Sequence, residues 1–157
     1  MFRISNKLST MISLSLSILL FCLLLVLTVW MPGVVDSMIE VGDRLGTRAQ
    51  ITPRERGLLL TLSYLMVAVA GGAILLLSLL LRTVLCDCVF SNSAVAFLRA
   101  LSWCCFAEGG LFLWVGLYFQ LAFGVCIVML FVGLCLRVVK NVIAQATRIK
   151  SENDFTI

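Results

Sequence analysis

Three long apolar runs constrain the fold of this chain more than any other feature. They occupy residues 12–30, 58–81 and 100–136 of a 157-residue sequence that is 62% hydrophobic and 13% charged, with a mean hydropathy of +1.13. One helical pass through a hydrocarbon core of about 30 Å takes about 20 apolar residues. The sequence therefore predicts an all-α integral membrane protein, with the lipid bilayer as its immediate surroundings.

The third run is too long for one pass at about 1.5 Å per residue and is expected to form two helices. We place the break near Tyr118, Phe119 and Gln120. One membrane domain over residues 1–157 then holds four transmembrane helices, and the first run is a retained anchor because no cleavage site follows it. We expect the helices at about 9–31, 53–81, 94–118 and 120–150, an outer loop at 32–52, a cytoplasmic linker at 82–93 and a tail at 151–157.

The distribution of lysine and arginine predicts the orientation, because short cytoplasmic segments carry an excess of both. An N-in/C-in topology puts twice as many basic residues inside as outside. The inner set is Arg3, Lys7, Arg82, Arg99, Arg137, Lys140, Arg148 and Lys150, and the outer set is Arg44, Arg48, Arg54 and Arg56. The end of the fourth helix is then a cytoplasmic extension.

Apolar residues within the expected outer loop recur at the spacing of a helix. The apolar residues that recur at that spacing are Val35, Met38, Ile39, Leu45 and Ala49. Glu40 precedes Arg44 by four residues, the favourable order for an ion pair. We expect a short amphipathic helix on the outer leaflet, either a ligand-sensing cap or a simple connector. The following T-P-R-E is a capping box that starts the second helix at Pro53.

Metal and catalytic chemistry find little support in the sequence. Five of the seven cysteines fall within the expected helices, and Cys86 and Cys88 have no histidine to complete a zinc site. The chain also lacks a nucleophile elbow and a phosphate-binding glycine loop. We therefore expect neither an enzyme nor a bound cofactor or metal, and no direct contact with nucleic acid.

Glu108 is the one ionisable residue expected at mid-bilayer depth. A carboxylate there costs a few kcal/mol, so the group should be neutral and should face another helix or water. It either carries a proton or cation, as in a small transporter or channel subunit, or is a structural hydrogen-bonding group. Small residues predict that the second and third helices pack closely with Glu108 at their seam, namely Ala68, Gly71, Gly72, Gly109 and Gly110.

Two expected cytoplasmic segments carry a family resemblance. One reads VFSNSAVAFLRAL, and the other is the C-terminal segment ending SENDFTI. The chain resembles the bacterial domain of unknown function 2975 family of small four-helix membrane proteins, in which a Pro-Phe-Ser/Thr stretch leads to Leu-Arg and the chain ends in Glu-x-Asp-Leu-Thr-Ile/Val. Val89, Ala94 and Phe155 depart from the family pattern. The matching positions are Phe90, Ser91, Leu98, Arg99, Glu152, Asp154, Thr156 and Ile157.

The resemblance implies a location and a partner. The location is the bacterial cytoplasmic membrane, and the partner is a small helix-turn-helix transcription regulator. The leading hypothesis is therefore a membrane-embedded regulatory or adaptor protein. Its partner-binding candidates are Phe90, Ser91, Arg99, Glu152, Asp154, Phe155, Thr156 and Ile157. Phe155 and Ile157 would share one face of an extended strand in this tail. A transporter built around Glu108, a purely structural protein and assembly as a homo-oligomer remain open.

Overall fold

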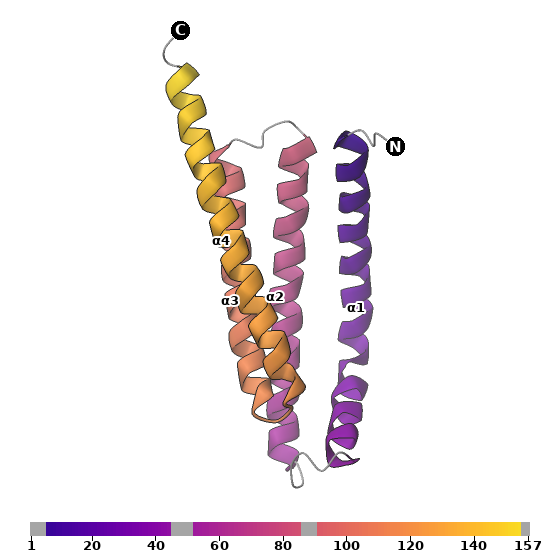
Figure 1. Cartoon of the computed structure of the whole chain (residues 1–157). Coiled ribbons are helices and arrows are strands. Elements are labelled where there is room, and N and C mark those ends of the chain that lie inside the picture. The colour runs from indigo at the N-terminus through magenta and orange to yellow at the C-terminus, as the bar shows by residue number, and fades with distance from the viewer. Residues whose placement is uncertain (1–5, 45–51, 86–90, 155–157) are drawn as a thin grey trace, which may run out of the picture.

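Four long helices make up nearly all of the described structure. The computed structural model describes residues 6–44, 52–85 and 91–154. Its helices are α1 (Asn6–Arg44), α2 (Pro53–Leu85), α3 (Asn92–Gly116) and α4 (Leu121–Asp154), shown in Figure 1. Each is long and apolar enough to cross a membrane. The chain is therefore an all-helical, multi-pass membrane protein.

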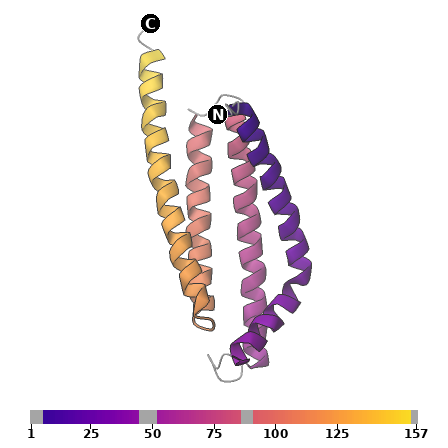
Figure 2. The ribbon, with the colours of Figure 1, turned by 45° about the vertical axis from the view of Figure 1, so that its right-hand side comes forward.

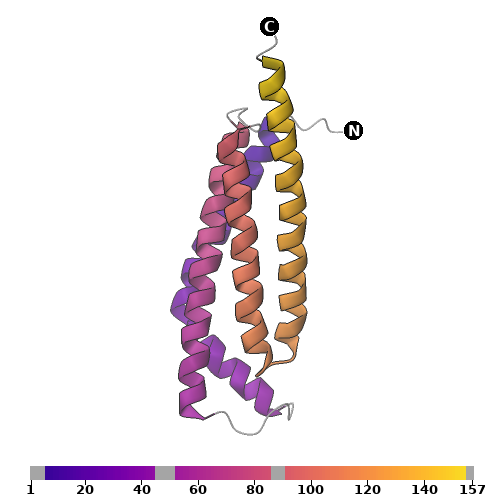
Figure 3. The ribbon, with the colours of Figure 1, turned by 90° about the vertical axis from the view of Figure 1, so that its left-hand side faces the viewer.

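The helices are arranged as a row in chain order. Among the described residues, α2 packs against α1 and α3, and α3 packs against α4 (Figures 1–3). As a result, α1 and α4 form the two edges of the row and each has one main neighbour. The start of α1 and the end of α4 lie at the same end of the molecule (Figure 1).

Helix α2 begins at Pro53, and its first turn shows why. The backbone N–H of Thr52 donates to Glu55 Oε2 at 2.8 Å, and the N–H of Glu55 lies 3.4 Å from Thr52 Oγ1. These reciprocal contacts form the capping box that the T-P-R-E sequence predicts. Pro53 fits the first helical position because a backbone N–H there would have no partner within the helix.

Helix α1 is longer than the sequence analysis predicted. It continues through Pro32 to Arg44, so the expected loop at 32–52 is wrong for residues 32–44. A proline in a helix removes one hydrogen bond and bends the axis, and neighbouring helices can stabilise the bend. In Figure 2 the last third of α1 turns to cross the end of α2. The proposed amphipathic segment is thus an extension of α1, and Leu45 and Ala49 lie outside the described residues.

The bent part of α1 is fixed to α2 by apolar and ionic contacts. Met31 and Val35 of α1 are buried against Leu59 of α2. The guanidinium of Arg56 donates to both carboxylate oxygens of Asp36, at 2.7 and 2.9 Å. A two-point contact of this kind sets direction as well as distance. It therefore orients the end of α1 relative to α2.

The connection between α3 and α4 is a tight turn over residues 117–120. It lies at the break that the length of the third apolar run predicted. Gly116 precedes it, and a Cβ atom at Gly116 would lie only 2.9–3.0 Å from the ring of Phe123. The missing side chain therefore lets α4 fold back directly onto α3.

The helix bounds at the opposite end also differ from expectation. Helix α2 extends to Leu85 and α3 begins at Asn92, which shortens the linker expected at 82–93. Helix α4 extends to Asp154, so residues 151–154 are helical rather than part of a separate tail. No glycine or proline follows Gly133 in α4, and nothing in that sequence ends the helix sooner.

Candidate functional site

The end of α4 projects beyond the other helices. Helix α4 has 34 residues and its antiparallel neighbour α3 has 25. The difference of nine residues corresponds to about 13 Å at 1.5 Å per residue. Figures 1 and 3 show this projection at the end of the molecule where both termini lie. The last turns of α4 are thus presented clear of the rest of the fold.

Arg137 joins α4 to α3 where the apolar run ends. Its guanidinium carbon lies 5.2 Å from the ring centre of Trp103 and 5.6 Å from that of Phe106. The two rings are themselves in an edge-to-face contact, with their centres 6.0 Å apart. Cation–π contacts of this kind suit a membrane interface, where an aromatic body is apolar and a guanidinium seeks a polar phase. They fix α4 to α3 within the part where the two helices run side by side.

The partner-binding candidates at the start of α3 have separate positions. Ser91 is the N-cap of α3, and its Oγ accepts a hydrogen bond from the N–H of Ala94 at 3.3 Å. Ser91 therefore stabilises the first turn of α3. Arg99 is exposed on α3. Phe90 lies outside the described residues.

The candidates near the C-terminus are divided between helix and undescribed chain. Glu152 and Asp154 belong to the last turn of α4, which corrects their expected place in a non-helical tail. Phe155, Thr156 and Ile157 lie outside the described residues, so the expected strand-like face there stays a prediction. The start of α3 and the projecting end of α4 share one end of the molecule (Figure 3).

Glu108 is buried between helices within the apolar part of the fold. Its side chain is 6% exposed, and its carboxyl interacts with the backbone of Ala70 in α2. Its Oε1 atom has no hydrogen-bond partner among the described residues. A buried polar atom without a partner costs free energy, and an ionisable residue within a membrane-spanning helix is a candidate functional site. The structure thus places Glu108 on the α2 side of α3.

The glycines do not form the close α2–α3 contact that the sequence suggested. A Cβ atom on Gly71 would meet Phe21 and Leu24 of α1, and one on Gly109 would meet Leu130 of α4. Gly72 and Gly110 face open space, and Ala68 is exposed. Neighbouring residues point about 100° apart around a helix, so Glu108 and Gly109 face different helices. The predicted pairing of these glycines is therefore wrong.

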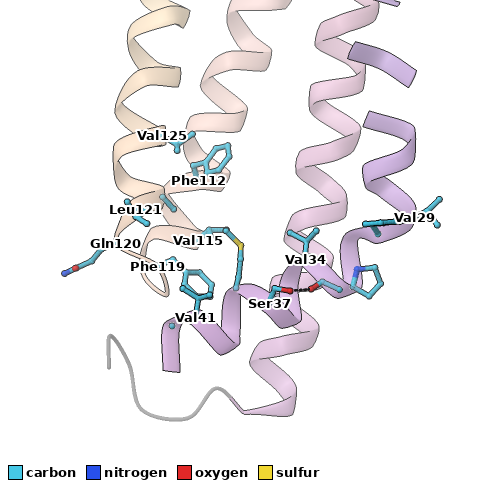
Figure 4. Close-up of a pocket in the computed structure, with 16 residues that line it drawn as sticks. Val29, Val34, Ser37, Val41, Phe112, Val115, Phe119, Gln120, Leu121 and Val125 are labelled. Atoms are coloured by element: carbon cyan, nitrogen blue, oxygen red, sulfur yellow. Dashed lines mark hydrogen bonds between the residues drawn. The ribbon is translucent and has the colours of Figure 1, made fainter. Parts of the chain in front are cut away.

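An apolar groove lies at the other end of the molecule, where the bent part of α1 approaches the α3–α4 turn. Its volume is about 980 Å³, and Figure 4 shows Val34 and Val41 of α1 on one side, with Phe112 and Val115 of α3 on the other. The Ser37 hydroxyl donates to the Gly33 carbonyl at 2.8 Å. The sequence analysis missed this groove because it ended α1 before Pro32.

The described residues hold no cluster of metal-binding side chains. All five described cysteines are free thiols, and each lies within a helix that is long and apolar enough to cross a membrane. Cys86 and Cys88 lie outside the described residues. The candidate features are therefore the projecting end of α4, the buried Glu108 and the apolar groove.

Comparison with known proteins places the chain in a family. Searches of curated proteins and of solved structures found no match. One family model, described as "Protein of unknown function (DUF2975)", matches residues 8–157 and so spans all four helices. This match agrees with the resemblance carried by the two motif segments, and the chain belongs to that family.

Proposed function

We propose that this protein is a membrane-embedded regulatory adaptor that holds a partner protein on the projecting end of α4. The observation that carries the proposal is the length of α4, which extends past α3 where the chain needs no further residues to cross the membrane. A continuous helix is stiff, so the projection presents its end at a fixed distance from the bilayer. We further propose that this end faces the cytoplasm, as the distribution of basic residues favours.

The charge pattern near the C-terminus supports a protein partner. Arg148 and Lys150 are followed by Glu152 and Asp154, so the sign of the charge changes within the last turns of α4. Basic residues suit a helix C-terminus and an anionic membrane surface, whereas the acids beyond them do not. These acids complement a basic surface, such as the face that a DNA-binding domain presents to phosphate. A small helix-turn-helix regulator, the partner that the family resemblance implies, has such a face.

Co-purification tests the proposal. The full chain, solubilised in mild detergent, is expected to retain a helix-turn-helix regulator in stoichiometric amount. Deleting residues 152–157 should abolish capture while leaving insertion and thermal stability unchanged, because the helical part of this segment lies where α4 projects beyond α3 (Figure 1). Asp43→Asn, which removes an acid at the opposite end of the molecule, is the matched control and should capture normally. Full capture by the truncated chain would refute the proposal.

A second candidate function is transport of a proton or cation through Glu108. The buried Oε1 atom without a partner favours it, since a carboxyl that serves only structure normally has its hydrogen bonds satisfied. Purified protein in liposomes would then show cation or proton flux that Glu108→Gln abolishes. Glu40→Gln, at an exposed position, is the control and should keep the flux. Equal flux in wild type and Glu108→Gln would remove this candidate.

A further inference from the structure

The apolar groove between α1 and the α3–α4 turn lies at the depth of the hydrocarbon core. Arg99 of α3 and Arg137 of α4 are the basic residues nearest to this turn along the two helices. About 25 Å of helix separates each arginine from the turn, at 1.5 Å per residue. A hydrocarbon core is about 30 Å thick and strongly disfavours charged side chains. A core that starts on the turn side of these arginines therefore extends past the turn.

The bent part of α1, residues 33–44, has one charged side and one apolar side. Its acids Asp36, Glu40 and Asp43 are exposed and lie outside the groove lining, and its groove side carries no ionisable side chain. Amphipathic helices of this kind lie at the membrane surface with their apolar side towards the acyl chains. The groove therefore lies on the hydrocarbon side of this segment, between it and the turn.

The groove has little that would hold water or a polar ligand. None of the described residues that line it is ionisable. The hydroxyl of Ser37 already donates to the carbonyl of Gly33, and the Gln120 side chain points away from the other lining residues (Figure 4). Apolar cavities do not hold ordered water, and an unfilled groove loses dispersion contacts along both walls. A hydrocarbon is the occupant that fits this lining.

We infer that this occupant is an acyl chain of a membrane phospholipid, so that the groove is a lipid-binding site. Val29 and Trp30 line the groove, are 77% and 71% exposed, and end the apolar run that crosses the bilayer. The groove is thus continuous with the lipid-facing surface of α1, and an acyl chain can enter it from the bilayer. The inference does not depend on the proposed adaptor function or on the orientation of the chain.

The shape of the groove distinguishes a bound lipid from the lipid that surrounds any membrane helix. An acyl chain inside it contacts Val34 of α1 on one side and Phe112 of α3 on the other (Figure 4), whereas a surrounding lipid lies against one surface only. Its volume of about 980 Å³ is at the upper end of the range of ligand sites, about 300–1,000 Å³. We therefore expect a phospholipid that stays bound in mild detergent.

Gly33 offers a way to fill the groove without disturbing the packing of the chain. It lines the groove, and a Cβ atom there would meet no heavy atom of another helix within 4 Å. Gly124 of α4 is the matched control, because a Cβ atom there also has open space but Gly124 is not part of the groove lining. Gly33→Leu should therefore block the site, and Gly124→Leu should leave it open.

Native mass spectrometry of the full chain measures the bound lipid. Each protein is reconstituted into vesicles of phosphatidylethanolamine and taken up again in mild detergent. Wild type and Gly124→Leu should retain phosphatidylethanolamine, and Gly33→Leu should retain at least about tenfold less. The inference is overturned by absence of lipid on the wild type, by equal retention in Gly33→Leu, by equal loss in both variants, or by a second chain bound in place of lipid.

A second measurement uses the wild-type chain and so does not depend on the folding of a variant. The vesicles contain phosphatidylethanolamine with a diazirine at the end of one acyl chain, and the protein is irradiated after it has been solubilised and the bulk lipid diluted away. Cross-links should fall on the groove residues Phe112, Val115 and Val125. Cross-links that fall equally on exposed apolar residues outside the groove, such as Val138 and Val142, would show that lipid has no specific site there.

Discussion

Replacing Glu108 by leucine should make the protein more stable, which is unusual for a change at a buried position. The carboxyl is 6% exposed and its Oε1 atom has no hydrogen-bond partner among the described residues. Burying such an atom costs about 1–3 kcal/mol, and a leucine of similar size removes that cost. We therefore expect Glu108→Leu to raise the free energy of unfolding by about 1 kcal/mol or more. Glu108→Gln keeps a polar group and should change it little.

The measurement is reversible unfolding in detergent micelles, followed by tryptophan fluorescence. A matched control is Ser17→Ala, because the hydroxyl of Ser17 is 2% exposed and hydrogen-bonded to Ser78 of α2 at 2.8 Å. Losing that interhelical bond should lower stability by about 0.6 kcal/mol, opposite in sign to Glu108→Leu. If Glu108→Leu instead destabilises the protein by more than Ser17→Ala, the interaction of the carboxyl with Ala70 outweighs the cost of burying Oε1, and our reasoning is wrong.

Three further predictions concern the contacts that shape the fold, each measured by the same unfolding assay. Asp36→Asn should cost at most about 1 kcal/mol, and less at high salt, because the ion pair is exposed; no salt dependence would argue against the pair. Gly133→Leu should cost about 1–3 kcal/mol, since a Cβ there already approaches Phe106 within 3.2–3.3 Å; full stability would contradict the close α3–α4 contact. Thr52→Ala should cost about 0.5–2 kcal/mol through loss of the cap, and Thr52→Ser should restore it.

Much of the fold could be predicted because the signals are local. The lengths of the three apolar runs indicate the number of transmembrane helices, and the T-P-R-E sequence marks the start of α2. The spacing of Glu40 and Arg44 predicts a helical ion pair, which the structure shows at 2.6 Å. The prediction at Pro32 was wrong because packing against another helix outweighed the local signal. A proline has a strong local preference against helix interiors, but packing of Met31 and Val35 on α2 stabilises the continued helix.

The rotation of each helix could not be predicted, and this limited the prediction of the candidate site. Helices in a membrane are apolar on nearly all sides, so the sequence does not reveal which face meets a neighbour. Gly109 was therefore assigned to α2 although it faces α4, while burial of Glu108 was predictable from the cost of exposing it to lipid. The groove depends on the bend in α1 and has no local sequence signal.

The central claim is that the end of α4 lies on the cytoplasmic side of the membrane, because the proposed capture of a cytoplasmic partner depends on it. It can be measured directly in intact cells with an impermeant thiol reagent, using chains in which Cys86 and Cys88 are replaced by serine. Asp43→Cys, at the exposed end of α1, should be labelled, whereas Ser151→Cys, near the end of α4, should be labelled only after the cells are lysed. Labelling of Ser151→Cys but not Asp43→Cys in intact cells would contradict the account.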